Sequence, residues 1–532
     1  MVWMVTVVLL FLSSQTLCTN PALKVRVTQN ALDYGRQVGM QVLQEELKKI
    51  NIPDQRGRAR RLRYQISRIH IRTFNIARST MAFSPGTGMK LSLDNVFIAV
   101  RGNWRMKYRF IRDSGSFHVS VNSLSVSELI RMSSDQTGRP AVKSAGCRAN
   151  VGRVRIKLRG GASWLYNLFR RPLERRFRSL LNRQICPEVS KVINKLEPKM
   201  KTLKVTANID RIAEIDYSLV NPPVVTRNFM DLDFKGEFYN IGRHQEPPFT
   251  AGPLSFPEQT NHMMYLAVSE FFFNSAAFVY HRAGALQINI TDSMIPESFP
   301  IRLSTSTFGG FIPQLKELYP EMLMLMKIRS LKPPVLRMTP DSITIAVTGA
   351  ADTFAILPNS SLAPLFVLNL DVSVSATPSL SGDKLTGSLE IKSAIENQSV
   401  FCERKYFAIR ALLVHVTQYH TGRCTQPSVQ VTPPSVSAVA SSLLLHRVVL
   451  MFYSPFCRLD LSMGRSNIGP FETSSLEGVL SFATKIAVLP KINALLAKGY
   501  PLPSLDRLSF VNPAIKVKEK FLMIATDIKY RL

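Results

Sequence analysis

The sequence predicts an α+β protein made of two copies of one arrangement, in which helices accompany antiparallel strands. Apolar residues recur at helical steps of three and four over residues 30–50 and 164–196. Between these segments, apolar and polar residues alternate as in half-buried strands. The same order recurs after residue 262, and a length of 532 residues accommodates two such domains.

The first 18 residues predict a secretory signal peptide. Val5–Leu12 is an apolar run without acidic residues, although a basic n-region is missing. The run is too short to span a membrane, and no later stretch reaches 18 uncharged apolar residues. We therefore expect a secreted, extracellular, soluble protein. Glycosylation sequons at Asn289, Asn359 and Asn397 fit that compartment.

The first predicted helix, 30–50, contains Gly35 and Gly39, where we expect another backbone to approach closely. Short alternating runs from Arg63 to about Val154 predict antiparallel strands with one dry face. A long helix is predicted over 164–196, and Pro172 and Pro187 should kink or divide it.

A stretch rich in Pro, Gly and polar residues, 236–262, predicts a linker between an N-terminal domain, 19–235, and a C-terminal domain, 263–532. In the second domain an apolar, helical stretch at 263–286 precedes strands through 391 and a helical segment at 476–496. A helix on a curved sheet encloses an apolar interior. Side chains can fill it or it can hold lipid tails, and the pattern alone does not choose.

The cysteines divide into a pair and an odd set. Cys147 and Cys186 bracket the end of the strands and the long helix, and in a secreted chain they should form a disulfide worth about 3–4 kcal/mol. The odd set, Cys402, Cys424 and Cys457, lies within 397–457. This segment differs in composition from its surroundings, so we interpret it as an atypical insertion, and whether it belongs to the mature protein stays open.

A zinc site made by these cysteines with His415 or His420 is an alternative, but no CxxC or HxxxH spacing supports it. We therefore expect neither a metal site nor a cofactor. The chain also contains no G-x-S-x-G motif, no H-E-x-x-H motif and no phosphate-binding glycine loop. Catalytic residues are not expected, and the protein is predicted not to be an enzyme.

Positive charge is concentrated in the first half of the chain. The whole sequence has a formal net charge of +30, and residues 1–250 contain 42 basic and 18 acidic residues. Such an excess attracts polyanions. No zinc-finger, RNA-binding or helix-turn-helix signature is present, so we expect no specific nucleic-acid ligand.

Three basic clusters lie in the N-terminal half of the chain. Their candidate anionic-lipid-binding residues are Arg56, Arg58, Arg60, Arg61 and Arg63 in the first cluster; Arg101, Trp104, Arg105, Lys107, Arg109 and Arg112 in the second; and Trp164, Arg170 and Arg171 in the third. The third cluster also contains Arg153, Arg155, Lys157, Arg159, Arg175, Arg176 and Arg178. Arginine forks bind phosphate in bidentate fashion, and neighbouring aromatic rings can enter an acyl layer. Cations interleaved with aromatic residues therefore suit an anionic membrane surface.

Several motifs resemble the family of bactericidal/permeability-increasing protein and lipopolysaccharide-binding protein. The N-terminal signature runs from Pro21-Ala22-Leu23 through Arg26-Val27-Thr28, with Val38 where the family usually has Glu or Gln. Further matches are Gly102–Phe110, Trp164–Arg171, Leu266–Asn274 and Lys498–Pro503. The resemblance covers residue 21 to the end, except for 397–457.

This resemblance implies a boomerang of two tubular lipid-binding domains joined by a central sheet. Each domain would be a curved antiparallel sheet wrapped around a long helix, with bound phospholipid in an apolar pocket, and the family places its disulfide at the position of Cys147 and Cys186. Tip loops corresponding to the first two clusters bind lipid A in related proteins, and the third cluster resembles their membrane-active segment.

The expected function is binding of lipopolysaccharide of Gram-negative bacteria at their outer membrane surface. The protein would act in innate immunity as a monomer, with antibiotic (bactericidal) or endotoxin-neutralising effect. A lipid or lipopolysaccharide carrier without killing activity is the alternative.

Overall fold

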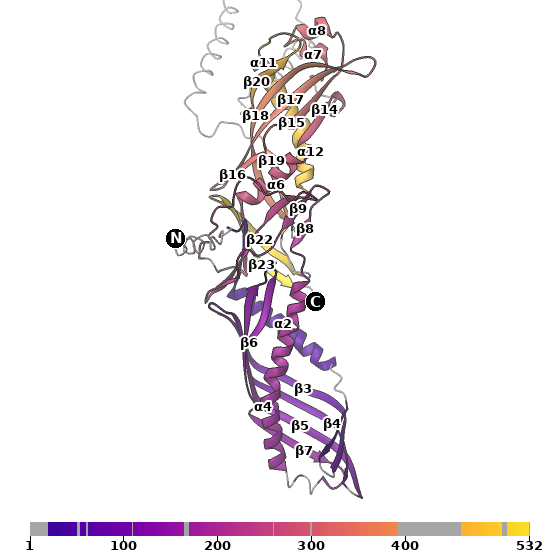
Figure 1. Ribbon diagram of the computed structural model, residues 1–532, viewed down its shortest axis with the longest axis vertical. Coiled ribbons are helices and arrows are strands. Elements are labelled where there is room, and N and C mark those ends of the chain that lie inside the picture. Colours follow the sequence, from indigo (N-terminus) through magenta and orange to yellow (C-terminus); the bar gives the residue numbers. More distant parts are fainter. Residues whose placement is uncertain are drawn as a thin grey trace, which may run out of the picture. The chain divides into compact units, whose positions relative to one another are not determined.

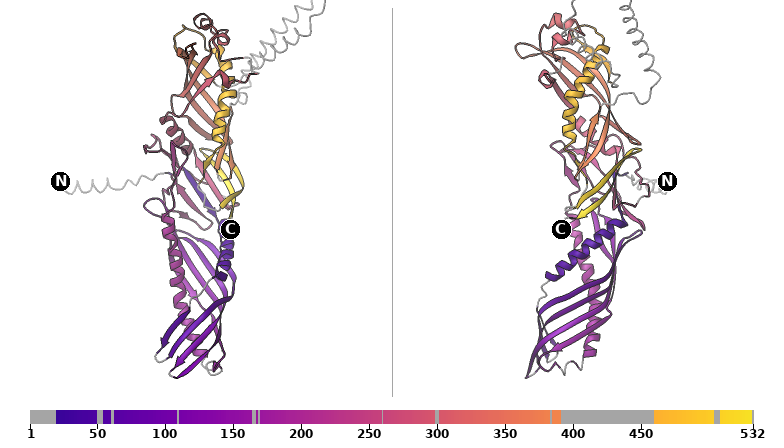
Figure 2. Two further views of the ribbon diagram at one scale, coloured as in Figure 1. Left: turned by 90° about the vertical axis from the view of Figure 1, so that its right-hand side faces the viewer. Right: turned by 180° about the vertical axis from the view of Figure 1, so that it is seen from behind.

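The computed structural model describes residues 20–49, 54–59, 62–108, 110–163, 167, 170–258, 260–297, 301–382, 384–390, 459–502 and 508–530. The predicted signal peptide, Asn397 and the segment 397–457 lie outside these residues. The chain forms two compact units, shown in Figures 1 and 2. The first unit extends to Phe272 and includes Pro503–Lys516 and Phe521–Leu532, and the second comprises Phe273–Leu502 and Val517–Lys520. Each contains a curled antiparallel sheet with long helices, as expected.

The larger sheet of the first unit is antiparallel throughout, with strand order β2-β3-β4-β5-β6 and β7 paired to β5. Helix α4 runs along this sheet, and α2 contacts β3 (Figure 1). The elements are β2 (Gln55–Ala59), β3 (Leu62–Ser84), β4 (Gly88–Tyr108), β5 (Ile111–Ser134), β6 (Pro140–Asn150), β7 (Arg153–Arg159), α2 (Gln29–Lys49), α4 (Arg170–Asn194) and α5 (Leu196–Lys201).

Strands β3, β4 and β5 are far longer than the short runs predicted from the sequence. Their register shifts at bulges, near which Arg68, Asn95 and Ser123 adopt left-handed backbone with φ of 52°, 54° and 53°. Each inserted residue moves the following side chains to the opposite face. One long strand therefore appears in the sequence as several separate alternating runs.

The two long helices correct two predictions. A Cβ built on Gly35 or Gly39 of α2 would meet nothing within 4 Å, so the expected close backbone approach there was wrong. Helix α4 is continuous across Pro187, so this proline does not divide it, and Pro172 lies in its first turn, where a missing N–H costs nothing. Next to Pro187, the disulfide at Cys186 fixes the helix to the sheet.

A second sheet of the first unit joins the start, middle and end of the chain in the order β10-β11-β1-β13-β23-β22. A small third sheet has the order β12-β9-β8. The predicted linker 236–262 therefore contributes a strand, β12, and part of the predicted C-terminal domain belongs to the first unit. The strands are β1 (Leu23–Thr28), β8 (Thr206–Asn208), β9 (Ala213–Asp216), β10 (Val224–Val225), β11 (Phe229–Phe234), β12 (Glu237–Asn240), β13 (Met264–Ser269), β22 (Leu508–Lys518) and β23 (Phe521–Tyr530).

A buried arginine fixes the remaining linker to this second sheet. Arg26 of β1 forms a bidentate pair with Asp231 at 2.8 and 2.9 Å and donates to the Pro257 carbonyl at 3.0 Å. Its guanidinium lies 3.6 Å from the Phe229 ring centroid and 5.0 Å from that of Phe256. Breaking such a buried pair would cost about 3–5 kcal/mol.

The second unit repeats the arrangement of helices and antiparallel strands. The apolar stretch predicted as a helix at 263–286 is instead strand β13 followed by helix α6, because β13 pairs with both β1 and β23. The remaining elements are α6 (Glu270–Arg282), β14 (Gln287–Thr291), η1 (Asp292–Met294), α7 (Thr305–Phe308), α8 (Gln314–Leu318), β15 (Met324–Ser330), β16 (Val335–Thr339), β17 (Ser342–Ile356), β18 (Leu362–Ser381), β19 (Lys384–Glu390), β20 (Leu459–Ser466), α11 (Ser474–Ala483), the π-helical η3 (Thr484–Val488), α12 (Leu489–Leu496) and β21 (Tyr500–Pro501).

The helical run Ser474–Leu496 matches the prediction for 476–496. By length and composition alone this run is apolar enough to cross a membrane. It contains Glu477, Lys485 and Lys491, and one of its faces packs into the core of the second unit through residues such as Leu476 and Leu480. This run therefore packs against the core of the second unit through one face.

Candidate functional site

The strand register brings basic residues of the first two clusters together at one end of the larger sheet. Arg58, Arg63, Lys107 and Arg112 are successive partners across β2, β3, β4 and β5. Directly opposed residues point to the same face of a sheet, so these four positions form one line, which we call the tip row. The side chains of Arg63, Lys107 and Arg112 are exposed.

The same face bears further predicted residues. One step along the strands, Arg56 is opposite Gln65, and Gln65 is opposite Arg105. Arg101 lies on this face farther from the tip. Strand β7 adds four exposed cations at alternate positions, Arg153, Arg155, Lys157 and Arg159. The three sequence clusters thus contribute to one cationic sheet face.

The charge on this face is not compensated within the described part of the chain. No ion pair there involves Arg63, Arg101, Arg105, Lys107 or Arg112. Like charges directly opposed across strands destabilise a sheet by roughly 0.2–1 kcal/mol per pair. A bound polyanion would remove this repulsion.

The aromatic residues of the second cluster do not share this face. Alternation along β4 directs Trp104 and Met106 to the opposite side from Arg105 and Lys107, and the Trp104 indole N–H donates to the Ser116 carbonyl at 3.2 Å. The expected interleaving of cations and aromatic rings is therefore a division between two faces. One face of the tip is cationic, and the other bears Trp104 and Met106, with Asp113 opposite Met106.

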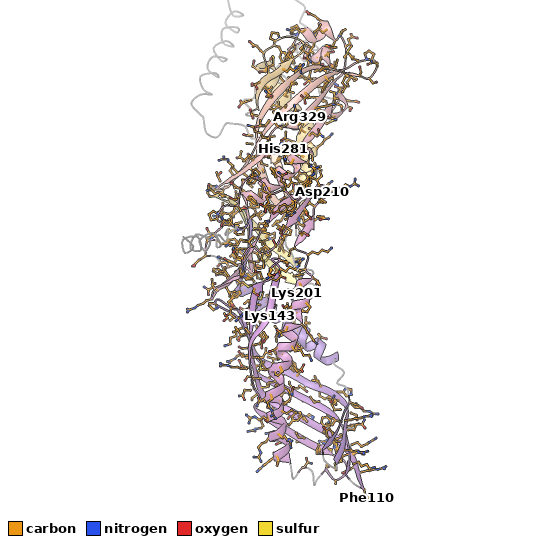
Figure 3. The ribbon with its side chains drawn as sticks, viewed as in Figure 1. Phe110, Lys143, Lys201, Asp210, His281 and Arg329 are labelled. Atoms are coloured by element: carbon orange, nitrogen blue, oxygen red, sulfur yellow. A yellow bond between two sulfur atoms is a disulfide. The ribbon has the colours of Figure 1, made fainter. Side chains whose placement is uncertain are left out.

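Phe110 occupies the apex between these two faces. It lies in the turn that connects β4 to β5, and its side chain is 98% exposed (Figure 3). The candidate residues chosen from the sequence do not include it. The sequence signal that could have indicated an exposed Phe110 is its position between two alternating runs. A large apolar residue at a hairpin turn has nothing to pack against.

The third cluster divides into outer and structural residues. Arg171 is exposed on α4, and Arg170 begins this helix. Arg178 instead donates to the Val151 carbonyl at 2.6 Å. Other polar residues on the same stripe of α4 bind backbone N–H groups at the edge of the sheet, with Glu174 accepting from Ile156 and Asn182 from Val151, both at 2.8 Å. The candidates Arg60, Arg61, Arg109 and Trp164 lie outside the described residues.

The predicted disulfide is confirmed. Cys147 of β6 and Cys186 of α4 are bonded, with their Cα atoms 5.5 Å apart. Of the sequons, Asn289 is exposed on β14 and Asn359 is exposed in the turn between β17 and β18. Glycosylation at either asparagine stays a prediction.

Apolar side chains line the interior between helix and sheet in both units. In the first unit, Phe177 and Leu181 of α4 pack against Val119, Val154 and Ile156 of the sheet. The second unit contains a cavity of about 30 Å³. Its lining is mainly apolar and includes Ile290, Leu303, Phe308, Met326, Val479 and Leu480. A cavity of this size holds about two water molecules at roughly 10–15 Å³ each, so an acyl chain would have to displace these side chains.

Comparison with known proteins identifies related chains over nearly the full length. Residues 31–196 match the "LBP / BPI / CETP family, N-terminal domain", and residues 207–400 and 428–530 match the C-terminal domain of this family. The C-terminal match omits residues 401–427, which lie inside the predicted atypical insertion 397–457. The match resumes at residue 428, within the same segment.

Individual relatives agree with this match. The bactericidal permeability-increasing protein of Sebastes schlegelii is 39% identical, over 99% of this chain and 98% of its own length. Human lipopolysaccharide-binding protein is 30% identical, over 98% and 96%. A crystal structure of lipopolysaccharide binding protein superposes with a TM-score of 0.55 and 26% identity, and covers 96% of this chain and 99% of that one.

Proposed function

The chain belongs to the LBP/BPI/CETP family, and from that premise we propose that it is a secreted protein that binds lipopolysaccharide through the cationic face of its first unit. The family consists of non-enzymatic lipid-binding proteins, which confirms the prediction that this chain is not an enzyme. The proposed site comprises the tip row, Arg105 beside it, and Phe110 at the apex.

The uncompensated tip row is the observation on which this proposal depends. Lipid A presents two phosphates on a disaccharide together with several acyl chains. Arg63 and Arg112 can bind phosphate oxygens in bidentate fashion, whereas Lys107 acts as a point charge between them. Phe110 projects from the same end of the sheet and would enter the acyl layer while the cations remain at the level of the phosphates.

Bound phospholipid is the second part of the proposal. The interiors between helix and sheet are apolar in both units. Each methylene buried there contributes about 0.8 kcal/mol, so one long acyl chain would offset the displacement of several side chains. Lipid extracted from the purified protein and identified by mass spectrometry tests this part.

The excess of cations favours a bactericidal or endotoxin-neutralising protein over a neutral lipid carrier. The two functions separate when the full chain is added to Gram-negative cells. Dye entry into the cells supports killing, whereas lipopolysaccharide transfer to acceptor vesicles without dye entry supports a carrier. The full chain is needed because β1 lies between β11 and β13, so a fragment ending at residue 235 would lose β13 from the second sheet.

A further inference from the structure

A second line of side chains crosses the cationic face farther from the tip. His70 of β3 is opposite Arg101 of β4, Arg101 is opposite His118 of β5, and His118 is opposite Lys157 of β7. We call these four residues the middle row. They alternate two imidazoles with two permanent cations across four adjacent strands.

The histidines of the middle row have no ionic partner among the described residues. His118 is partly buried, and its Nδ1 atom has no hydrogen-bond partner there. The only histidines found near a carboxylate in the described ranges are His244 and His262. Neither imidazole of the middle row is therefore held by a structural ion pair in the described part of the chain.

The surroundings of His118 are cationic or neutral. Its direct neighbours are Arg101 and Lys157, and the diagonal positions on β7 are Arg155 and Arg159. The diagonal positions on β4 are Asn103 and Ala99, and its own strand offers Ser116 and Ser120. On α4, which contacts β7, Glu174 accepts a hydrogen bond from the Ile156 N–H.

The surroundings of His70 are similar. Arg101 is opposite it, and Arg68 and Arg72 are exposed on its own strand. On that side, the Asp54 carboxylate accepts from the backbone N–H of Arg68 at 3.3 Å. Helix α2, which packs against β3, carries Glu45 and the pair Asp33–Arg36, and Arg36 donates to Ser79.

We propose that the middle row is a second anion site, which takes the phosphate of lipid headgroups at a membrane surface and strengthens as His70 and His118 are protonated. This inference rests on the proposed function, because it assigns a further contact and a pH dependence to the same cationic face. The row contains two permanent cations, Arg101 and Lys157, and protonation of both histidines would make it four adjacent cations.

Binding of protons and of the anion are coupled by linkage. A phosphate held between Arg101 and Lys157 favours the charged form of His118, and the charged form favours the phosphate by the same factor. Each added cation near an anionic surface strengthens binding by roughly fivefold, so two histidines give a gain on the order of tenfold or more between pH 7.4 and pH 5.5.

The test measures partition of the full chain onto vesicles at these two pH values. Vesicles of phosphatidylglycerol in phosphatidylcholine are suitable because the phosphodiester charge is constant over this range. Wild type should gain on the order of tenfold at pH 5.5, and H70Q/H118Q should lose most of that gain. H244Q/H281Q removes two histidines outside the larger sheet and is the matched control, which should keep the gain. H70K/H118K should bind tightly at both pH values.

The inference would be overturned if vesicle binding by wild type and by H70Q/H118Q increased equally at pH 5.5. It would also be overturned if H70K/H118K bound vesicles no more tightly than wild type at pH 7.4. Sulfate in place of chloride at constant ionic strength tests for a local site. If sulfate displaces wild type more strongly than H70Q/H118Q at pH 5.5, a local anion site is supported. If sulfate displaces both proteins equally, a local anion site is refuted. If wild type binds neither lipopolysaccharide nor vesicles at pH 7.4, the proposed function itself fails. Binding at pH 7.4 without an acid gain refutes only the middle row.

Discussion

Neutralising the tip row should weaken lipid A binding and stabilise the protein at the same time. The variant R63Q/K107Q/R112Q removes three exposed cations from adjacent strands, and none of them has an ion pair among the described residues. Each cation contributes about 1 kcal/mol near an anionic surface. The loss of three is about 3 kcal/mol, or on the order of a 100-fold weaker affinity.

The stability change has the opposite sign because two like-charged pairs disappear, Arg63 opposite Lys107 and Lys107 opposite Arg112. Such pairs cost roughly 0.2–1 kcal/mol each, and solvent screening places exposed pairs near the lower limit. The expected result is a small increase in the free energy of unfolding at low salt. The increase should shrink at high salt, where the repulsion is already screened.

Surface plasmon resonance on immobilised lipid A measures the affinity, and urea denaturation measures the stability. The variant K332Q/R337Q/K520Q removes the same charge from exposed positions of the second unit and is the control, with lipid A affinity close to that of wild type. An unchanged affinity in R63Q/K107Q/R112Q would refute the tip row as the binding site. A loss of affinity accompanied by clear destabilisation would show that the variant is misfolded, and that these arginines are structural.

Four further predictions concern single features. Replacing Cys147 and Cys186 by Ser should lower the free energy of unfolding of the first unit by about 3–4 kcal/mol in urea titrations, because the disulfide closes a loop with a sequence separation of 39. An unchanged free energy of unfolding would mean that packing alone fixes α4 to the sheet. Asn182→Ala leaves the Val151 N–H without its partner and should cost about 1–3 kcal/mol, seen as faster hydrogen exchange at Val151. Phe110→Ser should leave stability unchanged but weaken vesicle binding by about 2 kcal/mol without altering its salt dependence, and full affinity would exclude Phe110 from the acyl layer. Hydrogen bonds from the Thr137 hydroxyl and from backbone N–H groups lower the pKa of Asp135. The ionised Asp135 carboxylate therefore stabilises the fold above the ordinary carboxyl pKa, and this stabilisation is lost as pH falls through the lowered pKa. Asp135→Asn should flatten the acid limb of a plot of unfolding free energy against pH.

The sequence predicts the helices and the fold class well because their signals are local. The three- and four-residue spacing over 30–50 corresponds to α2, and the cysteines bond as expected. Strand length was not predictable, because bulges at residues such as Asn95 and Ser123 interrupt the alternation without ending the strand. Strand β13 was missed because a fully buried strand lacks alternation and looks like a buried helix.

The candidate site was predicted as a set of charges but not as an arrangement. Clustering along the chain identified Arg63, Lys107 and Arg112 individually. Their alignment in one row depends on the register between β3, β4 and β5, which three separated sequence segments do not reveal. The same register directs Trp104 away from Arg105, and it brings His118 between Arg101 and Lys157. Such neighbours arise from tertiary pairing, and no composition argument identifies them.

Equilibrium binding of the full chain to lipid A with and without its two phosphates, at physiological ionic strength, tests the central claim most directly. If the cationic face holds phosphate, removal of both groups should weaken binding by at least 100-fold while the acyl chains remain the same. Equal affinity for the two forms would mean that the exposed cations of the first unit do not recognise the ligand, and would contradict the account.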